Sequence, residues 1–208
     1  MSRARDLRAI QITAAEVLPE EALFARIRAL GALPPEARRA FAVELRDPAL
    51  PARALLALGR RLRAETLSLG ASLIVNDRLD LAQILGADGI HLGRRSVPVA
   101  EARAFLGPGP FVSVACHSVD DVFQAVTMGA DVVKLSPIFA SPGKGAPLGP
   151  GALTVAREAL DRLGKREVCL WALGGVDAGN AASCLSAGAS ALSSIRADLS
   201  TLLACLAN

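Results

Sequence analysis

Hydrophobic and polar positions follow two alternating patterns along the whole chain. Short continuous apolar runs, typical of strands buried on both faces of a parallel sheet, occur eight times. They lie at Leu7–Thr13, Ala40–Leu45, Ser72–Val75, Gly89–Leu92, Phe111–Ala115, Val132–Leu135, Val168–Leu173 and Ala191–Ile195. Between these runs, apolar residues recur at spacings of three and four, which predicts amphipathic helices. Examples are Glu20–Leu30, Ala52–Leu67, Val119–Met128 and Leu153–Leu163.

Residues at the ends of these segments predict where the helices start and stop. Asp77 and Ser118 stand where helix N-caps are expected. Glycines stand where helices should end, at positions 70, 86, 129, 164 and 188. Three of these glycines open a Gly-Ala-Asp or Gly-Ala-Ser sequence just before a strand, at residues 86–88, 129–131 and 188–190. We expect tight helix-to-strand loops there, in which the aspartates accept hydrogen bonds from nearby backbone amides.

Eight strand-then-helix units predict an α/β fold, a single (βα)8 TIM barrel. A chain of 208 residues fits one domain, so we expect one barrel over residues 1–208. An open, doubly wound sheet is the main alternative, because eight units in this length require short loops.

Composition excludes several classes of function. The net charge is only +3, Tyr is absent and Trp occurs once, which argues against a nucleic-acid-binding protein. No apolar run is long enough to cross a membrane and no signal-peptide pattern opens the chain, so a cytoplasmic protein is expected. Four cysteines, at positions 116, 169, 184 and 205, lack the CxxC spacing of zinc or dithiol sites. The last three are expected to act as small hydrophobes, whereas Cys116 adjoins His117 and has a nucleophilic role as its alternative.

The residues that follow the last two strands predict a phosphate site, because barrels of this class carry their ligands at the carboxyl ends of the strands. Gly174 and Gly175 remove side chains after the seventh strand. After the eighth strand, the turn at Ser194, Ile195 and Arg196 leads into an expected helix near Ala197, whose free N–H groups suit an anion. A tight turn without a ligand is the alternative.

Two further positions are candidates for ligand chemistry. The glycine-rich segment 141–149 surrounds Lys144 and resembles a mobile lid over an anion, although Lys144 is equally consistent with a solvated surface residue. His117 ends the fifth strand, where an imidazole can carry a proton, with a structural hydrogen bond as the alternative. His91 lies inside the fourth strand and is expected to be structural.

Taken in order, these segments resemble the thiamine-phosphate synthase and TenI superfamily. The resemblance is strong from about residue 72 to 196 and weak before it, where only residues 44–46 are recognisable. It is carried by Ile74-Val75-Asn76-Asp77-Arg78, Gly86-Ala87-Asp88-Gly89-Ile90-His91-Leu92-Gly93, Cys116-His117-Ser118, Ser136-Pro137-Ile138-Phe139 with Lys144, and Ala172-Leu173-Gly174-Gly175-Val176 with Asn180.

The resemblance implies a barrel, often a homodimer, that binds a small-molecule thiazole phosphate through the glycine pair and the turn after the eighth strand. Synthase members join it to a pyrimidine pyrophosphate with Mg²⁺, whereas some TenI-like members tautomerise a carboxylated thiazole phosphate by proton transfer without a cofactor. By matching position, His117 is the catalytic candidate, and Asp77 is a metal ligand only if Mg²⁺ is used. The matched substrate-binding positions are Glu44, Arg46, Asn76, Ser141, Lys144, Gly174, Gly175, Ser194, Ile195 and Arg196.

Departures from the synthase pattern fall mostly on its pyrophosphate half. The family's Gln-x-Arg-x-Lys reads Glu44, Arg46 and Pro48, and its second metal aspartate falls on Ser96. These losses remove a cation and a metal carboxylate, while Arg94 and Arg95 offer partial replacement. The leading hypothesis is therefore a TenI-like thiazole tautomerase. An active thiamine-phosphate synthase and a non-catalytic thiazole-phosphate-binding or regulatory protein are the alternatives.

Overall fold

A computed structural model describes residues 3–198 and contains a closed barrel of eight parallel strands. Each strand pairs with the next along the chain, and β8 closes the ring on β1. The strands are β1 (Ala9–Ile12), β2 (Phe41–Leu45), β3 (Ser72–Asn76), β4 (Gly89–Leu92), β5 (Phe111–Cys116), β6 (Val132–Leu135), β7 (Cys169–Leu173) and β8 (Ala191–Ser194). The predicted (βα)8 barrel is thus confirmed, and the open doubly wound sheet is excluded.

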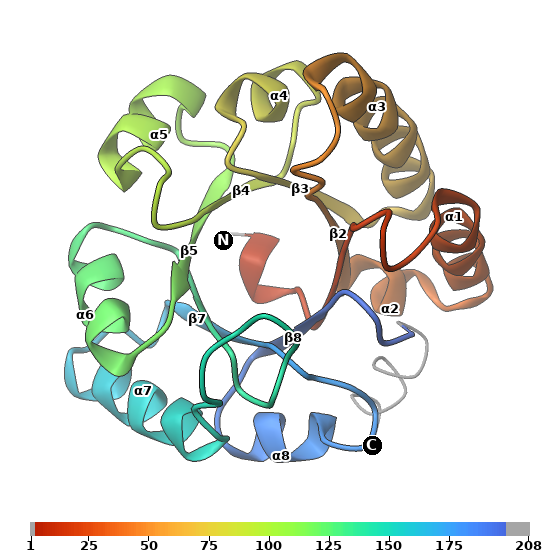
Figure 1. Ribbon diagram of the computed structural model, residues 1–208. Coiled ribbons are helices and arrows are strands. Elements are labelled where there is room, and N and C mark those ends of the chain that lie inside the picture. Colours follow the sequence, from red (N-terminus) through yellow and green to blue (C-terminus); the bar gives the residue numbers. More distant parts are fainter. Residues whose placement is uncertain (1–2, 199–208) are drawn as a thin grey trace.

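Helices surround the ring on its outside (Figure 1). They are α1 (Glu20–Ala29), α2 (Pro35–Arg39), α3 (Ala52–Leu69), α4 (Leu79–Ile84), α5 (Val99–Leu106), α6 (Val119–Thr127), α7 (Gly151–Arg162) and α8 (Ala181–Ser186), with short 3₁₀ turns η1 (Arg3–Arg5) and η2 (Leu30–Ala32). Within residues 3–198, no helix is long and apolar enough to cross a membrane.

Most of the predicted helix signals are confirmed. The Ser118 hydroxyl accepts a hydrogen bond from the Asp121 amide at 3.0 Å and caps α6. The five glycines expected at helix ends all have positive φ angles, between +56° and +98°. One signal was wrong: α4 is preceded by Arg78 without a side-chain cap, and Asp77 instead occupies a left-handed conformation with φ +64°.

Two expectations concern the C-terminal end of the chain. Residues 195–197 form bends and residue 198 is irregular, so the helix expected near Ala197 does not begin within the described residues. Cys205 lies outside them. Cys116, Cys169 and Cys184 are buried, as expected.

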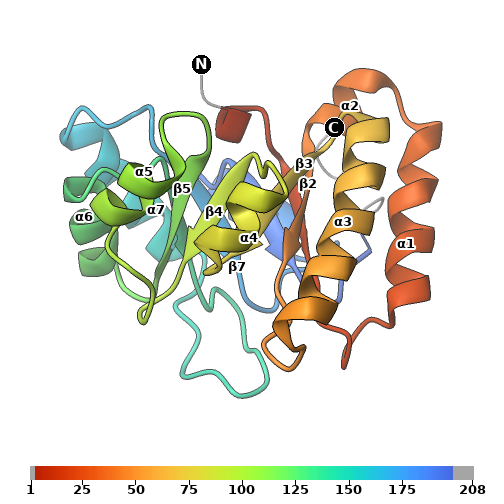
Figure 2. The same cartoon turned by 90° about the horizontal axis from the view of Figure 1, so that it is seen from above.

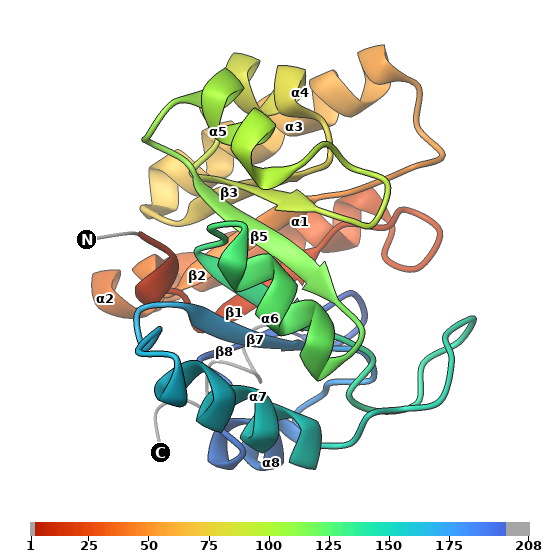
Figure 3. The same cartoon turned by 90° about the vertical axis from the view of Figure 1, so that its left-hand side faces the viewer.

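The two ends of the barrel differ. At the amino end, η1 lies across the opening of the ring (Figure 1), where Ala4 and Leu7 join an interior cluster with Phe111 and Trp171. At the carboxyl end, the long loop between β6 and α7 projects away from the body (Figures 2 and 3). The amino end is therefore plugged, and the carboxyl end is where a ligand can enter.

Candidate functional site

A cavity of about 910 Å³ opens at the carboxyl ends of the strands. Every site residue expected from the sequence lines it: Glu44, Arg46, Asn76, Asp77, His117, Ser141, Lys144, Gly174, Gly175, Ser194, Ile195 and Arg196. These residues are far apart in the sequence, but each stands at the carboxyl end of its strand or in the loop after it. The barrel gathers these ends at one face, so their place in the sequence was enough to predict that they meet.

Backbone amides form a cup on the β7–β8 side of the cavity. Within the described residues, the N–H groups of Gly175, Ile195 and Arg196 donate to no protein acceptor. The side chain of Gln11 on β1 holds this turn from behind, donating to the Ile195 carbonyl at 2.8 Å. Three free amides at a fixed turn suit the oxygens of a phosphate.

The hydroxyl of Ser194 has a structural part in this cup. It donates to the Val176 carbonyl at 3.2 Å and accepts from the Ala197 amide at 3.0 Å. These two bonds tie the turn after β8 to the loop after β7. Ser194 therefore fixes the shape of the cup.

The glycine pair is required for a reason that the sequence did not reveal. Their φ angles are +97° at Gly174 and +64° at Gly175. A Cβ on Gly174 would lie 2.6 Å from the Cα of Pro137, and one on Gly175 would lie 2.6 Å from the carbonyl oxygen of Ala140. The missing side chains thus admit the loop after β6, which packs against this turn.

His117 stands exposed in the cavity with one ring nitrogen engaged. Its Nδ1 lies 2.8 Å from the carbonyl oxygen of Ser136, an acceptor only, so Nδ1 carries a proton and donates it. Its backbone amide donates to the Asp121 carboxylate at 2.7 Å, which holds the residue at the end of β5. The neutral ring therefore has Nε2 as its unprotonated nitrogen.

Cys116, beside His117, does not supply a nucleophile. Burial raises the pKa of its thiol to about 12, and the nearby Asp121 carboxylate adds to this rise. A thiol with this pKa stays protonated at neutral pH. The nucleophilic alternative for Cys116 therefore finds no support in this environment.

The floor of the cavity contains an ion pair that sequence reasoning missed. Lys134 on β6 donates a hydrogen bond to Glu44 Oε2 on β2, and both side chains are only 1% exposed. Lys134 Nζ also lies 5.6 Å from the centre of the Trp171 ring. A charged residue inside an otherwise apolar run was the available signal, since β6 was predicted as a fully buried strand.

His91 completes this floor as a neutral residue. Its Nδ1 lies 2.9 Å from the Ser113 hydroxyl. Burial lowers the pKa of His91 to about 3, and the Lys134 ammonium contributes to this lowering. The expectation that His91 is structural agrees with this geometry, although its ring also lines the cavity.

Asp77 and the residues around it do not form an Mg²⁺ site. Asp77 accepts a 2.5 Å hydrogen bond from Ser96, the residue that stands where the family has its second aspartate. Among residues 3–198, no group of three His, Cys, Asp or Glu side chains is arranged to hold a metal. One exposed carboxylate that is already bonded to a hydroxyl, beside Arg94 and Arg95 on the cavity wall, does not fit the oxygen-rich shell of Mg²⁺.

The loop that carries Lys144 is open. Residues 142–147 are all exposed, and the backbone amide of Lys144 makes only a local turn bond to Ser141, at 3.2 Å. Lys144 lines the cavity together with four arginines, Arg46, Arg94, Arg95 and Arg196, and with the carboxylates of Glu16, Glu44, Asp77 and Asp177. The guanidinium and ammonium groups are available to an anionic ligand.

Several known proteins with similar sequences are named thiamine-phosphate synthase. A thiamine-phosphate synthase of Gloeobacter violaceus is 41% identical over 157 residues, covering 74% of this chain and 44% of that protein. The synthase of Moorella thermoacetica is 39% identical over 161 residues, covering 76% of this chain and 74% of that protein. The synthase of Methanoculleus marisnigri is 41% identical over 158 residues, which cover 74% of this chain and 72% of that protein.

Structure and family comparisons agree with these sequence matches. A thiamine phosphate pyrophosphorylase from Pyrococcus furiosus superposes with a TM-score of 0.80 over 98% of this chain and 95% of that one, and at 24% identity this supports the fold. The model of the family described as thiamine monophosphate synthase matches residues 15–197. The cavity with its amide cup thus lies in a barrel that belongs to the thiamine monophosphate synthase and TenI family.

Proposed function

We propose that this protein binds a thiazole phosphate in thiamine biosynthesis and acts on it as a TenI-like thiazole tautomerase. The observation that supports this most directly is the state of His117. Its Nδ1–H is fixed on the Ser136 carbonyl, which leaves Nε2 as the nitrogen free for proton transfer, and the residue is exposed in the cavity. An imidazole held in one tautomer beside a phosphate cup suits proton transfer on a bound phosphate ester.

In the proposed reaction, the amides of Gly175, Ile195 and Arg196 hold the phosphate. His117 Nε2 takes a proton from a carbon of the thiazole ring, and the electron pair left behind moves the ring double bond. The imidazolium then returns the proton to a second carbon, so that no atom or electron is gained or lost. The Ser136 carbonyl stabilises the imidazolium through its bond to Nδ1.

This chemistry needs no metal. Proton transfer develops less charge than the departure of a pyrophosphate, and the amide cup already neutralises part of the phosphate. We therefore expect a chelator to leave the tautomerisation rate unchanged.

The test is a comparison of His117→Ala with the wild type, using a carboxylated thiazole phosphate tautomer and monitoring its conversion to the aromatic thiazole. We expect a loss of at least 100-fold in kcat, with thiazole phosphate still bound in calorimetry because the cup is intact. Thr127→Ala on the exposed side of α6 serves as the control and should match the wild type. An unchanged rate in His117→Ala would remove this residue from the mechanism.

A second candidate is an active thiamine-phosphate synthase, favoured by the names of the relatives and by the cations Arg46, Arg94, Arg95 and Lys144 around the cavity. In this reaction guanidinium groups would bind pyrophosphate oxygens in the place of the missing lysine and aspartate. Thiamine phosphate formation from hydroxymethylpyrimidine pyrophosphate and thiazole phosphate, with and without Mg²⁺, tests it. Turnover that collapses in Arg46→Ala would establish the synthase, whereas ligand binding without either reaction would indicate a binding or regulatory protein.

A further inference from the structure

The buried pair under the cavity is the most unusual feature that the proposed mechanism does not use. TIM barrels fill their interiors mainly with branched apolar side chains. Here the layer beneath the ligand cavity holds Glu44, His91, Ser113 and Lys134, all buried. Burying charges is unfavourable unless they are paired, so this layer needs a reason.

Within this layer, only one of the two carboxylate oxygens of Glu44 is hydrogen-bonded. Lys134 bonds to Glu44 Oε2, and no described residue donates to Glu44 Oε1. Glu44 lines the cavity, whereas Lys134 does not. The lysine therefore lies behind the carboxylate, and the free oxygen of Glu44 is the one left for a ligand.

We propose that Lys134 is a positioning residue that keeps Glu44 an ionised hydrogen-bond acceptor at the cavity floor, so that Glu44 orients the ligand ring and proton transfer is left to His117 alone. The proposal rests on the proposed function only in placing a thiazole phosphate in the cavity.

The charges around Glu44 support this assignment. Burial by itself raises the pKa of Glu44, but the charges of Lys134 and Arg46 and the hydrogen bond from Lys134 lower it, so that the pKa lies below its ordinary value. Lys134 makes the largest lowering contribution and also donates the hydrogen bond. Without Lys134, the buried carboxyl would take up a proton and become a donor that competes with His117.

The test compares pH profiles of tautomerisation and of thiazole phosphate affinity in four proteins: the wild type, Lys134→Met, Glu44→Gln, and the double variant E44Q/K134M. We expect one acid-side ionisation in the wild type. The pH profile of Lys134→Met should show a second ionisation, that of the Glu44 carboxyl. Its midpoint should lie at least about two pH units above that of an ordinary carboxyl. The double variant should lose that second ionisation, because glutamine does not titrate, and it should also fold, because no unpaired charge remains.

A purely structural lysine predicts a different pattern. Lys134→Met would then change stability and overall rate but keep the wild-type pH profile, and this result would overturn the proposal. A second ionisation that persists in the double variant would overturn it as well, since Glu44 would not be its source.

A ligand-free measurement keeps the proposal testable if Lys134→Met does not fold or if the protein proves inactive on thiazole phosphate. Side-chain ¹³C NMR of glutamate-labelled wild type, with the Glu44 signal identified by its loss in Glu44→Gln, follows this carboxyl directly. We expect Glu44 to remain ionised below the pH at which the exposed glutamates titrate. If the Glu44 carboxyl titrated together with the exposed glutamates, the role of Lys134 would be overturned. If the protein only failed to act on thiazole phosphate, the proposed function alone would be overturned.

Discussion

At the scale of single residues, the buried imidazole of His91 couples the stability of the barrel to pH. Its pKa in the folded protein is lowered from 6.5 to about 3, chiefly by burial. Below pH 6.5 His91 becomes protonated in the unfolded chain but stays neutral in the folded protein. The free energy of unfolding is therefore undiminished above pH 6.5 and falls as the pH drops toward 3.

We therefore expect the free energy of unfolding to decrease between pH 6.5 and 5, with a slope that approaches about 1.4 kcal/mol per pH unit. Urea unfolding at a series of pH values measures this slope, and the range avoids the titration of ordinary carboxyls. His91→Asn should be less stable at pH 7 but show a clearly shallower slope. An equal slope in both proteins would mean that another group binds the proton.

The same scale shows how far side-chain chemistry can be predicted from sequence. Glu44 was identified by its match to a family position, but its partner Lys134 lies 90 residues away and follows no motif. Only the register of the closed barrel brings β2 and β6 to face each other across the interior. A pairing of this kind depends on the closed ring and cannot be obtained from local spacing.

At the scale of elements, the loops after β6 and β7 act as one unit. The Ile138 amide donates to the Leu173 carbonyl and the Phe139 amide to the Gly174 carbonyl, each at 2.9 Å. Residues 137–140 occupy the space that side chains at Gly174 and Gly175 would need. The position of the phosphate cup therefore depends on the lid-bearing loop packed behind it.

Alanine at Gly175 is expected to disturb this unit. The left-handed backbone and the 2.6 Å approach to the Ala140 carbonyl oxygen should together lower the stability by about 2–4 kcal/mol and weaken thiazole phosphate binding at least tenfold. Gly109→Ala is the matched control, because its Cβ would meet open space, and it should change neither quantity. Chemical unfolding and calorimetry on both variants measure the effects; equal behaviour of the two would contradict the packing argument.

Elements were predicted better than their contacts. All eight strands lie within about two residues of their predicted bounds, because continuous apolar runs flanked by glycine and aspartate are a strong local signal. The packing role of the glycine pair could not be predicted, for a physical reason. Their missing side chains face a neighbouring loop, and the sequence carries no information on which loop comes close.

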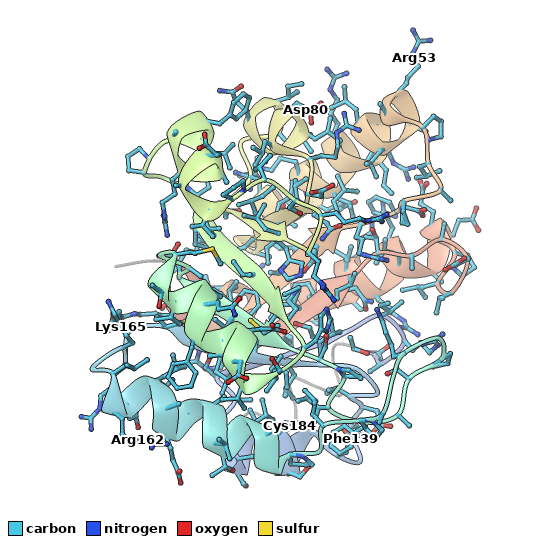
Figure 4. All side chains as sticks on the ribbon, turned by 60° about the vertical axis from the view of Figure 1, so that its left-hand side comes forward. Arg53, Asp80, Phe139, Arg162, Lys165 and Cys184 are labelled. Atoms are coloured by element: carbon cyan, nitrogen blue, oxygen red, sulfur yellow. The ribbon has the colours of Figure 1, made fainter. Side chains whose placement is uncertain are left out.

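At the scale of the whole molecule, the two ends of the barrel divide stability from ligand binding. Phe139 and Lys165 lie toward opposite ends in Figure 4, the first near the projecting loop and the second near the plugged amino end. At that amino end, the two Gly-Ala-Asp loops repeat one arrangement. Asp88 accepts from the Leu73 amide and from Arg63, and Asp131 accepts from the Val112 amide and from Arg103, at 2.8–2.9 Å.

Each aspartate stands just before β4 or β6 and is bonded to the neighbouring strand, β3 or β5, and to the helix before that strand, α3 or α5. Asp131→Ala removes an acceptor from a strand amide and from a guanidinium, so we expect a loss of roughly 1–3 kcal/mol in the free energy of unfolding. Thiazole phosphate affinity should stay within about twofold, because no cavity residue contacts Asp131. Glu167→Ala, just before β7, is the control: that carboxylate forms an exposed ion pair with Lys165, whose removal should cost less than about 0.5 kcal/mol. If Asp131→Ala instead weakened ligand binding as much as it weakened folding, the amino end would be coupled to the site, and the division between the two ends would not hold.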